Sequence, residues 1–143
     1  MRRRYDRLFF QKGSRGPEVF PRIVLHPGAH VTCAGYEIVC ELRQELPEPD
    51  KQKTVLVADH VEKTEIVLRS RLPGDRIRLA GRPEKTLKRL FIDEKIPLQE
   101  RDQIPILEVD GKLVGVYGFG MDQRMFPKYS AEIVWVTIRR LNQ

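Results

Sequence analysis

The sequence predicts a mainly β fold with one or two helices, in the α+β class. Many short segments are rich in β-branched or alternating apolar residues, turn residues separate them, and a single stretch has helical periodicity. The chain has 143 residues, of which 41% are hydrophobic and 32% are charged. That is enough for one globular domain with its own core, or for two small domains.

The expected strands follow one another along almost the whole chain. They cover residues 5–12, 19–25, 31–45, 54–59, 65–71, 76–79, 104–109, 112–117 and 131–141. Pro21 makes an interior position in a sheet unfavourable for the second segment, and Gly35 marks a turn or a bulge within the third. Asp110-Gly111 predicts a tight hairpin turn between the strands that flank it.

The segment 46–53 has two prolines and no hydrophobic pattern, so we expect a linker or a long loop there. This loop divides the chain into N-terminal strands, residues 1–50, and a C-terminal domain, residues 51–143. The N-terminal strands either form a subdomain or belong to the same sheets as the rest of the chain.

The predicted helix begins at Pro83 and ends before Pro97. Proline is tolerated in the first helical turn, and a later proline forces the residue before it out of the helical region. At about 3.6 residues per turn, the side chains of Leu87, Leu90 and Phe91 form one apolar stripe, which predicts packing on a sheet. The opposite face carries three basic side chains, namely Lys85, Lys88 and Arg89.

Positive charge is concentrated around this helix. Residues 68–105 hold ten basic and six acidic side chains, which gives +4 of the formal net charge of +6. Because side chains alternate along a strand, we expect the arginines of the neighbouring strands to face outward and to share one phosphate-binding surface with the helix. The candidate contacts are Arg69, Arg71, Arg76, Arg78, Arg82, Lys85, Lys88, Arg89 and Arg101. Such charge favours an acidic partner, with nucleic acid first and an anionic membrane surface second.

Motifs for catalysis are missing from the sequence. It contains no Walker loop, no GxSxG, no HExxH and no CxxC, so we assign no catalytic residue and no metal site. The spacing of His26, His30, Cys33 and Cys40 differs from the tight pairs of structural zinc sites, which leaves zinc as a minor alternative to small core cysteines and a turn histidine.

The two cysteines fit a reducing compartment. No segment reaches the roughly 18 apolar residues of a membrane-spanning helix, and the apolar run near the start is too short for a signal peptide. We therefore expect a cytoplasmic protein that does not contact membranes.

An ordered set of short motifs resembles the C-terminal domain of bacterial tRNA(Ile)-lysidine synthetase. The motifs are Arg69-Ser70-Arg71, Gly74-Asp75-Arg76-Ile77, Leu87-Lys88-Arg89-Leu90-Phe91-Ile92-Asp93, Lys95-Ile96-Pro97, Arg101-Asp102, Pro105 and the hairpin end Val114-Gly115-Val116-Tyr117-Gly118. The agreement covers about residues 59–118. The resemblance implies a sandwich-like module that is also found in the β subunit of phenylalanyl-tRNA synthetase.

The resemblance also implies a function. The full enzyme is a ligase that uses ATP, with magnesium, to adenylate C2 of the wobble cytidine of tRNA(Ile), after which lysine displaces AMP and forms lysidine. This chain lacks the SGGxDS loop of the adenylating domain. It would therefore hold no cofactor and be inactive alone, and it would bind tRNA(Ile) at the acceptor stem through the nine basic residues while its own N-terminal catalytic domain performs the chemistry.

A structural role is the alternative. The chain would then pack on the catalytic domain, or on a second copy as a homodimer, without touching RNA. The candidate surfaces for that role are the exposed ends of the sheet and the apolar last strand at residues 133–138.

Overall fold

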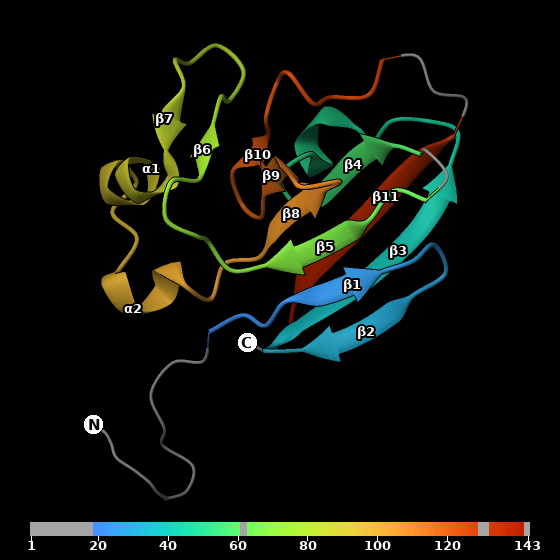
Figure 1. Cartoon of the computed structure of the whole chain (residues 1–143), viewed down its shortest axis with the longest axis horizontal. Helices are drawn as coiled ribbons and strands as arrows, with labels where there is room; N and C mark the ends of the chain where they lie inside the picture. Colours follow the sequence, from blue (N-terminus) through green and yellow to red (C-terminus); the bar gives the residue numbers. More distant parts are fainter. Residues whose placement is uncertain (1–18, 61–62, 129–131, 142–143) are drawn as a thin grey trace, which may run out of the picture.

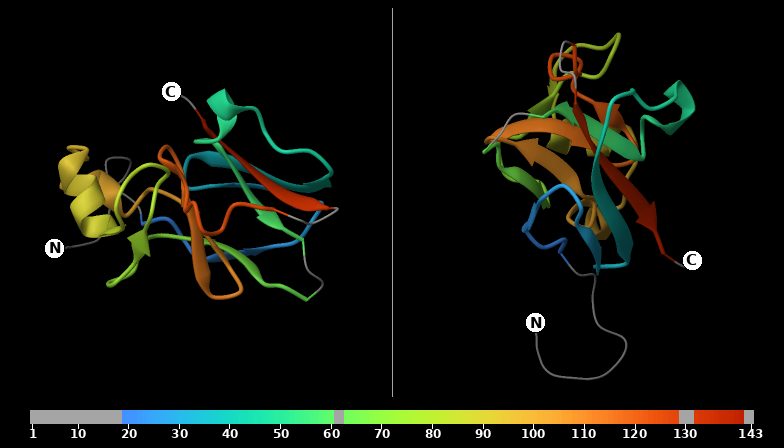
Figure 2. Two further views of the ribbon diagram at one scale, coloured as in Figure 1. Left: turned by 90° about the horizontal axis from the view of Figure 1, so that it is seen from above. Right: turned by 90° about the vertical axis from the view of Figure 1, so that its right-hand side faces the viewer.

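The computed structural model describes residues 19–60, 63–128 and 132–141. Two antiparallel sheets pack face to face, and a small module with two helices lies at one end of them (Figures 1 and 2). The predicted mainly β fold with one or two helices is therefore confirmed. The strand expected at residues 5–12 lies outside the described residues.

The first sheet has five strands in the order β1-β5-β8-β9-β10. They are β1 (Ile23–Leu25), β5 (Ile66–Arg69), β8 (Ile106–Val109), β9 (Lys112–Val116) and β10 (Gly120–Met121). The short β1 is an edge strand, as the proline before it predicts. The predicted hairpin between β8 and β9 is confirmed, since Asp110 and Gly111 have φ angles of 53° and 82°, the positive values of a type I′ turn.

The second sheet has four strands in the order β2-β3-β11-β4. They are β2 (His30–Cys33), β3 (Tyr36–Arg43), β4 (Val55–Asp59) and β11 (Ile133–Arg140). Gly35, with a φ of 84°, lies in the turn between β2 and β3, which confirms the predicted turn. The 3₁₀ helix η1 (Pro49–Lys51) lies within the long loop that follows β3.

The last strand, β11, occupies the middle of the second sheet. Its backbone pairs with β3 on one side and with β4 on the other, and the side chains of residues 133–136 and 138 are buried. The prediction that residues 133–138 offer an apolar surface for packing on the catalytic domain or on a second copy is therefore wrong. A sequence pattern identifies such a strand as apolar but does not reveal that it has neighbours on both sides.

Strands from the first fifty residues belong to both sheets. β1 pairs with β5 in the first sheet, and β3 pairs with β11 in the second.

The main core fills the space between the sheets. Leu68 and Leu107 from the first sheet and Ile38, Leu56 and Val136 from the second are all completely buried in it.

A second apolar cluster holds the helical module on the first sheet. Leu87, Leu90 and Phe91 of α1 (Leu87–Asp93) pack with Ile77 of β6 (Arg76–Ile77) and with Val116 of β9. The predicted apolar stripe of the helix is thus confirmed. Each of these side chains is at most 1% exposed, and burial of such a side chain contributes about 1.5–3 kcal/mol.

The helix begins later than predicted, at Leu87 instead of Pro83. The short strand β7 (Lys85–Thr86) pairs with β6, so Lys85 is not part of the helix. Thr86 caps it, because its Oγ1 accepts a hydrogen bond from the N–H of Arg89 at 3.1 Å. A second helix, α2 (Leu98–Arg101), follows Pro97. Neither of these two described helices has the length or the apolar composition needed to cross a membrane.

Candidate nucleic-acid interface

The loop that follows β5 is fixed by a buried cluster of charged side chains. Arg69 donates Nε to Glu108 at 2.5 Å and its two terminal nitrogens to Asp75 at 2.8 and 3.2 Å. The same carboxylate of Asp75 accepts the N–H of Leu72 at 2.7 Å, which closes the turn over residues 72–75. In addition, the carbonyl of Asp75 accepts the N–H of Leu87 at 2.9 Å, so this turn also positions the start of α1.

Arg69 does not belong to the candidate surface. Only 7% of it is exposed, so the prediction that it faces outward with Arg71 is wrong. Burial disfavours the charged guanidinium, but the hydrogen bonds to Asp75 and Glu108 outweigh that effect and raise the pKa of Arg69. Its charge therefore balances two carboxylates inside the fold.

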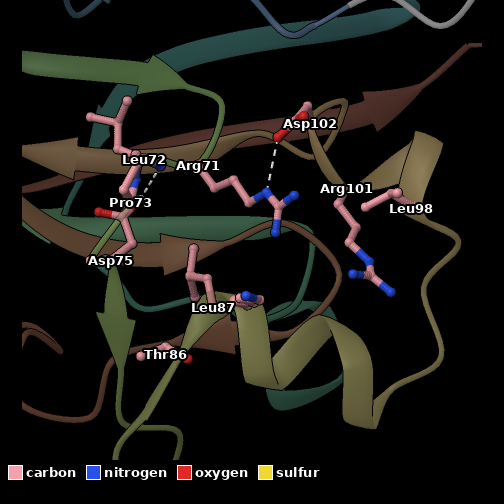
Figure 3. Close-up of a pocket in the computed structure, with 11 residues that line it drawn as sticks. Arg71, Leu72, Pro73, Asp75, Thr86, Leu87, Leu98, Arg101 and Asp102 are labelled. Atoms are coloured by element: carbon pink, nitrogen blue, oxygen red, sulfur yellow. Dashed lines mark hydrogen bonds and ion pairs between the residues drawn. The ribbon is translucent and has the colours of Figure 1, made fainter.

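A pocket of about 560 Å³ lies between the 72–75 turn, α1 and α2 (Figure 3). Three basic side chains line it, namely Arg71, Lys88 and Arg101. They come from three different segments, and each was among the nine predicted contacts. The structure brings these three together.

Arg71 and Arg101 are held in place through their Nε atoms. Arg71 donates Nε to Asp102 at 2.9 Å, and its guanidinium carbon lies 5.9 Å from the centre of the Phe91 ring. Arg101 donates Nε to the carbonyl of Ile96 at 2.8 Å. In Figure 3 the side chains of Arg71 and Arg101 both extend toward α1. Among the described residues their terminal nitrogens have no further partner, so two nitrogens with four oriented N–H groups remain available on each side chain.

Lys88 completes the cationic lining. Its side chain projects from α1, is exposed, and makes no hydrogen bond or ion pair with any described residue. The acidic side chains of the lining, Asp75 and Asp102, are already bonded to Arg69 and Arg71 respectively. The pocket therefore offers unused donors and no unused carboxylate.

Four other predicted contacts are exposed or half-buried and paired with acidic neighbours. The pairs are Arg76–Glu84, Arg82–Glu94, Lys85–Asp93 and Arg89–Asp93. The hydrogen bond from Lys85 lowers the pKa of Asp93, and those from Arg76 and Arg124 lower the pKa of Glu84. Exposed pairs of this kind contribute only about 0–1 kcal/mol, so a phosphate group can compete for the cations. Arg78 is exposed, and its side chain has no partner among the described residues.

Sequence reasoning missed Arg124, which lies in the loop after β10. It donates to Asp122 and to Glu84, each at 2.8 Å, and so connects this loop with the hairpin of β6 and β7. Glu84 is 40 residues away in sequence, and no local pattern identifies such a contact.

The histidines and cysteines that were considered for zinc do not converge. Within the described ranges no three His, Cys, Asp or Glu side chains lie close enough together to hold a metal ion. His30 instead bonds Glu37 through Nε2 at 2.7 Å. Cys40 is a buried core residue, as predicted, and burial raises its pKa to about 11; burial also raises the pKa of Cys33.

The fold and this basic end define a class of protein, a two-sheet accessory domain with a candidate surface for nucleic acid. Residues 66–136, from β5 into β11, match the family model described as the TilS substrate C-terminal domain. A crystal structure of a TilS C-terminal domain superposes with a TM-score of 0.72 and 28% identity, over 85% of this chain and 98% of that one. The chain belongs to the family of TilS C-terminal domains.

Similar full-length proteins have the corresponding names. The bifunctional protein TilS/HprT of Listeria monocytogenes is 31% identical over 120 residues, which is 81% of this chain and 18% of that protein. The tRNA(Ile)-lysidine synthase of Caldanaerobacter subterraneus subsp. tengcongensis is 48% identical over 63 residues, 43% of this chain and 14% of that protein. The chain thus spans less than a fifth of the length of these relatives.

Proposed function

We propose that this chain is the tRNA-binding part of a tRNA(Ile)-lysidine synthetase. The whole protein would use ATP and magnesium, bound in an N-terminal catalytic domain outside this chain, to join lysine to C2 of the wobble cytidine of tRNA(Ile). The present chain would hold the acceptor stem and have no ligase activity alone. Family membership supports this assignment, as do the names of the relatives.

The observation that carries the proposal is the set of unused cationic groups at one end of the fold. Arg71 and Arg101 present oriented donors, and Lys88 and Arg78 are exposed with no described partner for their side chains. Double-helical RNA is bound mainly through its shape and its phosphates, for which arginine and lysine side chains are sufficient.

The first test is a titration of this chain with tRNA(Ile) at several salt concentrations. Each neutralised phosphate contributes about −0.7 to −0.9 to the slope of log affinity against log salt. With about four phosphates contacted, the affinity should fall more than tenfold between roughly 50 and 200 mM salt. Affinity that does not depend on salt would exclude an interface made of these cations.

The second test reverses charges at the two unpaired side chains. The Arg78→Glu and Lys88→Glu double variant should bind tRNA at least about tenfold more weakly and show a smaller salt slope. Lys112→Glu is the matched control, because Lys112 is exposed in the β8–β9 hairpin, at the opposite end of these strands from Arg69. The proposal fails if both variants lose affinity equally.

Packing on the catalytic domain is a second candidate role, and one observation favours it. Val19 and Val24, in or next to the edge strand β1, are 61% and 44% exposed. If the chain only packs on its parent, the Val24→Ser variant should release it from the catalytic domain, and tRNA should not bind to the isolated chain. Gel filtration of the two parts, with and without tRNA, separates the two roles.

A further inference from the structure

The pocket between the 72–75 turn, α1 and α2 differs from the rest of the basic surface because it is recessed. The side chain of Arg71 is only 20% exposed, against 64% for Arg89 on the outer face of α1. The flank of an RNA duplex is convex and rigid, so its phosphates reach protruding side chains more readily than recessed ones. A group that fits this pocket has to project from the RNA.

The donors in the pocket suit a terminal phosphate better than an internal one. A phosphate monoester carries about −1.5 to −2 charges at pH 7 and presents three acceptor oxygens. An internal phosphodiester has one charge and two free oxygens. The pocket provides the terminal nitrogens of Arg71 and Arg101 and the ammonium of Lys88, which are enough donors for all three oxygens.

The rim of the pocket is apolar. Leu72 in the turn and Leu98 at the start of α2 both line the pocket and are 53% and 67% exposed. The flank of a duplex consists of sugars and phosphates, whereas its end exposes the flat apolar faces of the last base pair. Apolar side chains beside three cations therefore match the end of a duplex.

We infer that this pocket receives the 5′-terminal phosphate of the bound RNA, with the last base pair against Leu72 and Leu98. The inference rests on the proposed function, since it specifies which part of the RNA the basic end holds. It assigns Arg71, Lys88 and Arg101 to the terminal phosphate, and it leaves Arg78 and the exposed ion pairs for the phosphates of the flank.

The test uses an RNA hairpin with one open end, carrying either a 5′-phosphate or a 5′-hydroxyl, and the full chain at constant salt. The phosphorylated hairpin should bind about tenfold more tightly, as expected for charge-assisted hydrogen bonds to a dianion. Equal affinity for the two hairpins overturns the inference. The proposed function fails separately, if neither hairpin nor tRNA binds in a salt-dependent way.

Variants on one helix then locate the effect. Lys88→Ala should reduce the preference for the 5′-phosphate to about threefold or less, and Lys88→Arg should restore it. Arg89→Ala is the control, because Arg89 is exposed on the same helix but does not line the pocket. It should weaken the binding of both hairpins alike and leave the ratio of the two affinities unchanged. If Lys88→Ala does not alter this affinity ratio, the inference is also overturned.

Inorganic phosphate distinguishes an RNA end from a general anion site. At concentrations equal to that of the hairpin it should not displace the phosphorylated RNA, because it lacks the base pair that packs on the rim. Leu98→Ser should weaken the binding of both hairpins without changing the ratio of their affinities. Displacement by equimolar inorganic phosphate would show that the pocket does not recognise the end of an RNA.

Discussion

Arg69 and Arg71 lie two residues apart and have opposite roles. Alternation along a strand predicts that both face outward on the same side. Arg69 is buried instead, because Glu108 of the neighbouring strand and Asp75 of the next turn enclose its guanidinium. Arg71 follows the end of β5 and extends over Phe91 into the pocket.

Replacement of Arg69 tests its structural role. Arg69→Met would leave Asp75 and Glu108 as carboxylates without a cation in a largely buried position, which typically costs about 3–5 kcal/mol. We expect a fall of about 3 kcal/mol in the free energy of unfolding, measured by urea denaturation. The further change Glu108→Gln should recover part of the loss, because it removes one of the unpaired charges.

Arg89→Met is the control for this experiment. Arg89 also pairs with a carboxylate, that of Asp93, but its side chain is 64% exposed. The expected loss is below about 1 kcal/mol. If Arg69→Met and Arg89→Met lose similar small amounts, the cluster around Arg69 does not stabilise the fold.

At the scale of elements, Asp122 connects the loop after β10 with the residue that follows β6. Its carboxylate is buried and accepts the backbone N–H groups of Arg78 and Arg124, at 3.1 and 2.8 Å. It also accepts two bonds from the Arg124 guanidinium. Burial raises the pKa of Asp122, but these hydrogen bonds outweigh burial, and the resulting pKa is lowered.

This lowered pKa predicts how stability depends on pH. Because the folded-state pKa lies below the unfolded value of about 3.9, the contribution of Asp122 is present above that pH and is lost as the pH falls through the folded value. Asp122→Asn should cost about 1–3 kcal/mol at pH 7 and progressively less in acid. Urea denaturation at neutral and at acidic pH measures the loss of stability under each condition. Asp50 is an exposed residue of η1, so Asp50→Asn should leave the pH dependence of the free energy of unfolding unchanged. If the difference in stability between Asp122→Asn and the unchanged chain stays constant with pH, the prediction is contradicted.

The elements that the sequence predicted well are those that depend on local patterns. The stripe of α1 follows from helical periodicity, and the β8–β9 turn follows from the backbone preference of Asp110-Gly111. The predicted start of α1 was wrong because Thr86 caps the helix and also pairs with Arg76 in a short sheet. Arg76 lies ten residues earlier, so no local pattern predicts this pairing. A four-residue helix such as α2 is too short to produce a periodic signal.

The candidate site shows the same limit. Arg71, Lys88 and Arg101 were predicted individually from charge and from the family motifs. Their convergence on one pocket depends on the packing of three separate segments. The acidic partners that occupy the other predicted contacts are likewise fixed by the tertiary structure, so a count of charges overestimates the unpaired cations.

At the scale of the whole molecule, the main core and the second cluster share structural elements. Ile106 and Leu107 are neighbours in β8, but Ile106 belongs to the second cluster and Leu107 to the main core. Tyr117 packs against both clusters, and its ring lies 5.2 Å from that of Tyr36 in the second sheet. A substitution that destabilises the helical module should therefore also destabilise both sheets.

This coupling predicts a single cooperative unfolding transition. Leu90 is completely buried in the second cluster, so Leu90→Ala should cost about 2–5 kcal/mol. Trp135 lies in the second sheet and does not belong to that cluster, yet its fluorescence midpoint in urea should fall together with the midpoint measured by circular dichroism. Ile92→Ala, on the exposed side of the same helix, should shift both midpoints only slightly. If Leu90→Ala leaves the Trp135 midpoint in place, the helical module unfolds independently, and variants in the pocket can then be interpreted without concern for the stability of the sheets.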